Sequence, residues 1–213
     1  MTQSPSLQSE QITMLTDLLL SLVAGALAVR VLARLESGAD GWFAAWSLAF
    51  GFTSAAALMG GLFHGLRYRA SPEASRRLWR LTLVLTAGVG FSLMVVAAQV
   101  GISPLTHTLL LGAGVVKFAV VLWRLRGSWS FGLVAADSGI SLVVLGLVAC
   151  WGLRAGVLGG EGWWIVGGVT ISLLGAAVQQ TRVWHGRPFD HNDLFHLVQI
   201  VASILFFRGS GQW

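Results

Sequence analysis

The residues best suited to chemistry lie at 190–196, in the sequence Asp190-His191-Asn192-Asp193-Leu194-Phe195-His196. Four of these seven side chains can titrate, and a mainly apolar run continues from here to Arg208. Titratable side chains inside a membrane are costly unless they are paired or have a function. If a helix begins here, Asp193 and His196 share a face because they are three residues apart, and Asn192 joins them at a spacing of four. The spacing predicts an acid–imidazole pair that can move protons or bind a metal ion.

A plainer interpretation of the same segment is a helix terminus. Asp190 is then the N-cap, and Asp193, at the third helical position, complements the positive end of the helix dipole. This interpretation leaves His196 without a role. His191 lies about 140° around the helix from His196, because each residue advances the helix by about 100°, and therefore belongs to another face.

Composition places the whole chain in a membrane. Of its 213 residues 55% are hydrophobic and only 11% charged, with a mean hydropathy of +0.74, whereas about 25% of residues are charged in soluble domains. The net charge of +5 comes from 13 arginines and one lysine. The arginines fall in short predicted loops, which indicates topology signals and lipid contacts and argues against a nucleic-acid partner. A single cysteine, Cys150, excludes an internal disulfide.

The apolar runs predict an all-α, polytopic membrane protein. Crossing the hydrocarbon takes about 20 mainly apolar residues, and tryptophans such as Trp46 and Trp123 fall near the ends of such runs, as in an interfacial aromatic belt. No removable signal peptide is expected at residues 1–11, which lack a basic region. We expect one seven-helix transmembrane domain over residues 1–213, with helices at about 12–35, 41–66, 78–100, 103–124, 129–152, 162–181 and 190–208.

The arginines also predict orientation, since positive residues concentrate on the cytoplasmic side. Nine lie on the side of the N-terminus: Arg67, Arg69, Arg76, Arg77, Arg80, Arg124, Arg126, Arg182 and Arg187. Four lie on the other: Arg30, Arg34, Arg154 and Arg208. This asymmetry predicts a cytoplasmic N-terminus and an outside C-terminus. The Arg- and Gly-rich composition suggests the cytoplasmic (inner) membrane of a bacterium.

With this topology, the costly polar residues gather near the cytoplasmic face. Lys117 and Asp137 lie deeper, at about 10 and 13 Å along their helices at 1.5 Å per residue, and a simple explanation for them is mutual neutralisation. The shallower group lies within about two helical turns of the cytoplasmic ends and consists of Asp17, His64, Asp193 and His196. This convergence of several helices on one level predicts a functional site.

Histidine and carboxylate side chains together suit zinc. We predict His64, His196 and Asp193 as ligands, with Asp17 and Asp193 as the catalytic carboxylates that orient or deprotonate a metal-bound water. His64 can alternatively extend to lipid headgroups beside Arg67, and Asp17 can pair with a neighbouring arginine. Secondary candidates for the site are His191, Asn192, Lys117 and Asp137.

Two short motifs resemble those of a known superfamily. Gly-Gly-Leu-Phe-His at 60–64 and Asn-Asp-Leu-Phe-His at 192–196 are similar to the zinc-ligand motifs of the seven-helix ceramidase and adiponectin-receptor superfamily, which includes the alkaline ceramidases and the progestin and adipoQ receptors. In that superfamily a Ser-x-x-x-His motif on the second helix and a His-x-x-x-His motif on the seventh bind zinc, together with an Asp on the third. The resemblance implies that His64 and His196 correspond to two of these ligands.

The chain departs from the superfamily pattern at three places. Gly60 stands in place of the motif serine, Asn192 in place of the first histidine of the seventh helix, and residues 78–100 contain no acid. The resemblance therefore implies replacement of the missing groups, with Asp193 and Asp17 as the candidates.

Together these observations predict a zinc-dependent hydrolase of a lipid amide or ester, embedded in the membrane, with metal-bound water as the nucleophile and membrane lipids as its partners. Two other classes stay open. His64 and His196 can be axial ligands of a haem in electron transfer, or Asp17, Lys117 and Asp137 can form a transport or proton path. A purely structural role and the oligomeric state are also left open by the sequence.

Overall fold

The computed structural model describes residues 7–35, 41–100, 103–182 and 188–211. Within these ranges the chain forms helices and no strand, as the sequence predicts. The seven helices are α1 (Leu7–Leu32), α2 (Gly41–Leu66), α3 (Pro72–Ala98), α4 (Pro104–Gly127), α5 (Phe131–Arg154), α6 (Glu161–Thr181) and α7 (His191–Gly209). The fold is therefore all-α.

Two helices begin earlier than predicted because polar residues form their first turns. Ser71 caps α3 by accepting a hydrogen bond from the backbone N–H of Ala74, and Pro72 takes the first helical position. Glu73 then pairs with the arginines three and four residues further on. The Arg-rich stretch that was expected to be a loop therefore belongs largely to α3, and α1 likewise begins at Leu7 instead of residue 12.

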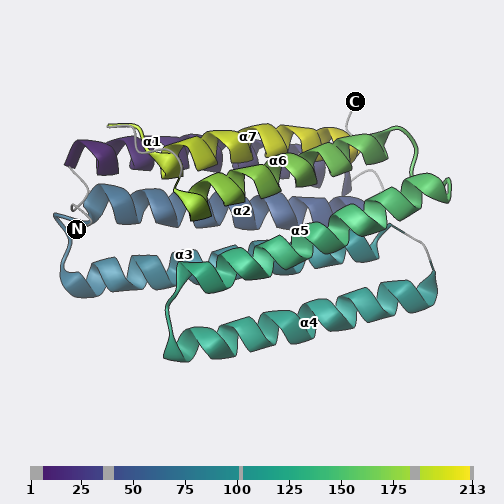
Figure 1. Ribbon diagram of the computed structural model, residues 1–213, viewed down its shortest axis with the longest axis horizontal. Helices are drawn as coiled ribbons and strands as arrows, with labels where there is room; N and C mark the ends of the chain where they lie inside the picture. Colours follow the sequence, from purple (N-terminus) through teal and green to yellow (C-terminus); the bar gives the residue numbers. More distant parts are fainter. Residues whose placement is uncertain (1–6, 36–40, 101–102, 183–187, 212–213) are drawn as a thin grey trace.

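Six helices, α1 to α6, are long and apolar enough to cross a membrane. This indicates an integral membrane protein. The last helix, α7, has 19 residues and packs against α1 and α6 over much of its length (Figure 1).

The helices form a ring with one helix outside it. Contacts run from α1 to α2, α2 to α3, α3 to α5, α5 to α6, α6 to α7 and back to α1. Helix α4 packs on the outer side of α3 and touches α5 only slightly, so it lies at the edge of the bundle (Figure 1). The ring leaves an interior to which six helices can contribute side chains.

Aromatic side chains line one end of this interior. Trp46 stacks on Phe50 with ring centroids 5.7 Å apart and meets Phe206 at 5.4 Å. Because Trp46 is only 1% exposed, the prediction that it belongs to an interfacial belt is wrong. Trp123 is 64% exposed, as a lipid-facing residue should be.

A second apolar cluster, which includes Leu83, Val121, Leu125 and Val134, joins α4 to α3 and α5.

Candidate functional site

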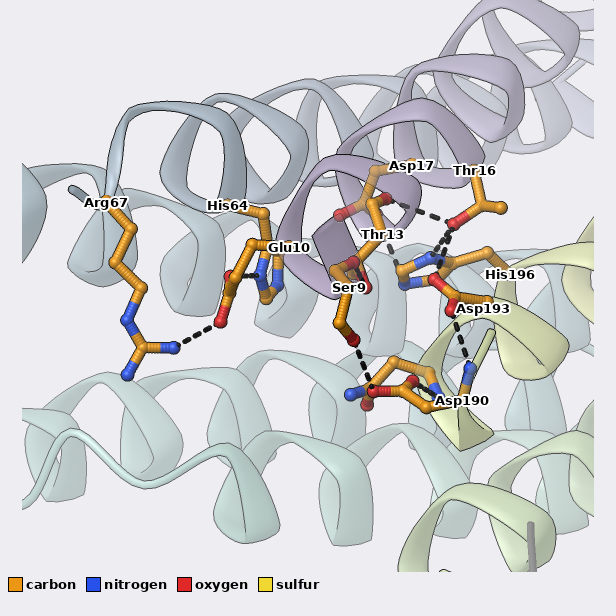
Figure 2. Close-up of polar contacts among 11 residues, drawn as sticks. Ser9, Glu10, Thr13, Thr16, Asp17, His64, Arg67, Asp190, Asp193 and His196 are labelled. Carbon is orange, nitrogen blue, oxygen red and sulfur yellow. Dashed lines mark hydrogen bonds and ion pairs between the residues drawn. The ribbon is translucent and has the colours of Figure 1, made fainter. Parts of the chain in front are cut away.

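The centre of the site is a pair formed by Asp17 of α1 and His196 of α7. Asp17 Oδ1 lies 3.2 Å from His196 Nε2, and the two residues are 5% and 8% exposed. On the other side of the ring, His196 Nδ1 lies 3.0 Å from the hydroxyl of Thr16. Figure 2 shows the imidazole between these two α1 residues. Both ring nitrogens are thus engaged, which fixes the plane of the imidazole.

The hydrogen bonds of Thr16 determine how protons can be arranged. Its hydroxyl donates to the backbone carbonyl of Thr13 at 3.0 Å or to Asp193 at 3.4 Å. When it does so, its oxygen accepts the Nδ1–H of His196, and Nε2 faces Asp17. The contact between Asp17 and His196 then holds one shared proton, so the pair can accept or deliver a proton.

Asp17 fits against α2 because two glycines let α1 approach closely. A Cβ added at Gly60 would lie 3.1 Å from Asp17 Oδ2. A Cβ added at Gly61 would lie 3.3 Å from the backbone carbonyl of Met14, and backbone cannot move aside as a flexible side chain can. Gly60, one of the departures from the superfamily motif, therefore provides the space that the Asp17 carboxylate occupies.

Asp193 serves the start of α7, as the plainer interpretation predicted. Its Oδ2 accepts the backbone N–H of Asp190 at 2.7 Å, while Asp190 accepts the N–H of Asn192 at 2.8 Å, which makes a reciprocal capping box. Asp193 is fully buried and does not face the interior of the ring. Its other oxygen meets Thr16 and so helps to hold the residue that orients His196.

His64 belongs to a second polar group on the same side of the bundle. Its Nδ1 lies 2.7 Å from Glu10 Oε2, and Arg67 donates to Glu10 Oε1 at 2.8 Å. Figure 2 shows this group beside the Asp17–His196 pair. Glu10 lies outside the first helix as predicted from the sequence, which began at residue 12, and was therefore not among the predicted site residues.

A polar stripe in the sequence could have revealed Glu10. Ser9, Glu10, Thr13, Thr16 and Asp17 recur every three to four residues, which places them on one face of a helix. All of them except Thr16 are buried in the structure. The stripe faces α2 and α7, the helices that carry His64 and His196.

The predicted zinc ligands are not brought together. His64 is bound to Glu10, and Asp193 is bound to its own helix terminus, so neither joins His196 in a shared coordination geometry. Among the described residues, no group of three or more histidine, cysteine, aspartate or glutamate side chains is arranged to hold a metal ion. The zinc site stays a prediction.

Lys117 and Asp137 form a separate pair away from this site. Lys117 Nζ of α4 lies 2.5 Å from Asp137 Oδ1 of α5. Gly90 of α3 leaves space for the carboxylate, because an added Cβ would overlap Asp137 Oδ2. This geometry agrees with mutual neutralisation, and neither residue lines the interior of the ring.

A cavity of about 660 Å³ lies inside the ring. Asp17, His64 and His196 are on its wall, and the secondary candidates His191 and Asn192 line it at the start of α7. The cavity is polar at the end where α7 begins and apolar at the opposite end. The polar end includes Arg67, Arg76 and Arg182, and the apolar end includes Trp46, Phe50, Leu93 and Phe206.

Comparison with protein families places nearly the whole chain in one group. A model described as a family of unknown function, DUF6962, matches residues 12–213. No curated protein matches the chain.

Proposed function

The chain belongs to the DUF6962 family, whose function is unknown, and we propose that it is a membrane-embedded hydrolase of a lipid amide or ester. The observation that carries this proposal is the Asp17–His196 pair at 3.2 Å on the wall of a cavity with one polar and one apolar end. A lipid can place its chain in the apolar end and its polar linkage beside the pair. The motif resemblance to the ceramidase and adiponectin-receptor superfamily supports the same reaction class.

The proposed reaction uses the pair as a general base and then as a general acid. With the shared proton on His196 Nε2, the Asp17 carboxylate accepts a second proton, from a water molecule, as the water oxygen bonds to the carbonyl carbon. The pair then returns a proton to the leaving nitrogen or oxygen as the bond from this atom to the carbonyl carbon breaks. His196, held by Thr16, keeps the carboxylate oriented and stabilises its charge. Water reaches the pair from the polar end of the cavity.

We also propose the complete topology that the sequence predicts. All seven helices cross the membrane, with the N-terminus in the cytoplasm and the C-terminus outside, in the cytoplasmic membrane of a bacterium. The parallel course of α7 beside α1 and α6 supports a seventh span (Figure 1). In this orientation the arginine-lined end of the cavity opens toward the cytoplasmic face.

The two alternative functions have less support from the geometry. A haem with His64 and His196 as axial ligands would require breaking the Glu10 contact of the first and the Asp17 or Thr16 contact of the second. A proton path through Asp17, Lys117 and Asp137 would require a polar connection between two pairs. Lys117 and Asp137 lie between α4 and α5 and outside the cavity lining.

The test measures hydrolysis of a panel of lipid amides and esters by the full chain in neutral detergent, together with its metal content and absorption spectrum. We expect product release by the wild type and its loss in Asp17→Asn and His196→Gln. His107→Gln is the matched control, because His107 does not line the cavity and contacts the backbone of Ala98. Equal activity of wild type and His196→Gln contradicts the assignment. A Soret band would favour the haem alternative.

A further inference from the structure

The charges that line the cavity are unequally distributed. Among the residues that the structure describes, its lining includes three arginines, Arg67, Arg76 and Arg182, and one carboxylate, Asp17. The arginines come from three different helices or helix ends, at the close of α2, the first turns of α3 and the C-cap of α6. They therefore converge on one end of the cavity, although they are far apart in sequence.

The carboxylates beside these arginines do not neutralise all of their positive charge. Glu10 is shared by Arg67 and His64. Glu73 is shared by Arg76 and Arg77, at 3.0 and 2.9 Å, and its side chain is 54% exposed. Glu73 thus serves two guanidinium groups, and Arg182 adds a further charge. Such an arrangement favours an anion, and guanidinium groups match phosphate oxygens particularly well.

The distance along the cavity between the arginines and Asp17 matches the spacing between the headgroup and the first acyl linkage of a lipid. Gly60 lies beside Asp17, and Arg67 is seven residues further along α2, or about 10 Å at 1.5 Å per residue. On α3 the lining runs from Arg76 to Leu93, or about 25 Å by the same rise. A headgroup at the arginines therefore places the first amide or ester near Asp17 and the hydrocarbon beyond it.

We propose that the cavity binds a lipid with a phosphate headgroup, which Arg67, Arg76 and Arg182 hold at the polar end while the acyl chain extends toward Trp46 and Phe206. This inference rests on the proposed function for the reaction, and it names the class of substrate. The binding itself does not require hydrolysis. Phosphate recognition and catalysis can therefore be tested separately.

The experiment titrates three probes against the full-length Asp17→Asn protein in neutral detergent and follows thermal stabilisation. The probes are oleoyl lysophosphatidate, monooleoylglycerol with the same acyl chain, and inorganic phosphate. We expect the phosphate lipid to bind at least about tenfold more tightly than the neutral lipid, because hydrogen bonds between charged groups are stronger than those between neutral groups. Inorganic phosphate should give no stabilisation at the same concentrations. Equal affinities for the two lipids, or equal stabilisation by inorganic phosphate, would overturn the proposal.

Neighbouring arginines provide the matched control. Arg76→Gln should weaken binding of the phosphate lipid about tenfold, and Arg182→Gln should have a similar effect. Arg77→Gln should change it less than about twofold, because Arg77 shares Glu73 but does not line the cavity. Equal weakening by Arg76→Gln and Arg77→Gln would show a general effect of surface charge and refute the site. If phosphate-dependent binding is found and no lipid is hydrolysed by the wild type, the proposed function fails and the binding site stands.

Discussion

Asp17–His196 and Lys117–Asp137 are both acid–base pairs that join separate helices, and all four residues except the half-buried Lys117 are buried, yet their surroundings differ. The first lies on the wall of a cavity, with a threonine holding the far side of the imidazole. The second lies outside the cavity lining, between the ring and the outer helix α4, where Gly90 makes room for it. In both pairs, the contact between the two partners offsets part of the free energy lost when polar groups leave water. Only the first can also meet a ligand.

This comparison separates a site from a structural link. Helix α4 packs against α3 but has few contacts with α5, so Lys117 adds a polar link between α4 and the ring helix α5. His196 instead belongs to a helix that α1 and α6 already hold along its length. We therefore expect substitutions in the first pair to affect chemistry and substitutions in the second to affect stability.

The largest effect is expected for Asp17→Asn. Asparagine has nearly the same shape as aspartate but cannot accept a proton, so the hydrolysis rate should fall about 10²–10⁴-fold. The melting temperature in detergent should stay close to that of the wild type. Rate measurements on the best lipid substrate and a thermal unfolding curve check both parts. Unfolding of Asp17→Asn under conditions in which the wild type is stable would contradict the separation of the two roles.

Lys117→Met should lower stability and leave the specific activity unchanged. Removal of one partner leaves the Asp137 carboxylate buried without its counter-charge, which typically costs about 3–5 kcal/mol. The variant should unfold at a lower denaturant concentration, while any folded fraction keeps its specific activity. The double variant Lys117→Met/Asp137→Leu should recover much of the loss, because it removes both charges. Failure of the double variant to recover would mean that the pair is not the source of the cost.

Gly60→Ala tests the space around Asp17. The added methyl group would lie 3.1 Å from Asp17 Oδ2 and should displace the carboxylate, which we expect to lower the rate about ten- to a hundredfold. Gly51→Ala is the control on the same helix, because nothing lies within 4 Å of an added Cβ there. The control should keep its rate and gain slight stability from the better helix former. Equal rates for the two variants would place Asp17 outside the reaction.

The smallest effect is expected for Thr16→Val. Valine keeps the volume of threonine but removes the hydroxyl that contacts His196 and Asp193. Loss of one such hydrogen bond costs about 1 kcal/mol, so the rate should fall about fivefold. Thr16→Ser should restore the rate, since serine retains the hydroxyl. A Thr16→Val protein with the wild-type rate would show that the orientation of the imidazole does not depend on this contact.

The amino-acid sequence determined the broad architecture because hydropathy and helix length are local properties. Its apolar runs predicted seven helices in the right places, and the cap at Asp190 could be identified from residue types alone. The predicted bounds are wrong where polar residues continue a helix beyond its apolar part. In α3, the start signal Ser71-Pro72-Glu73 precedes the apolar run by several residues. The pairing of Lys117 with Asp137 was also among the explanations that the sequence offered.

Only the tertiary structure decided which polar residues meet. Spacing along a helix predicted that Asp193 and His196 share a face, but it could not show that Asp17 of α1 and not Asp193 contacts the imidazole. That choice depends on the close approach of α1 to α2 at Gly60 and Gly61, which no single helix encodes. The position of α4 outside the ring and the cavity inside it likewise arise from packing among helices. Contacts between helices depend on how all of them fit together, whereas the existence of each helix depends mainly on its own residues.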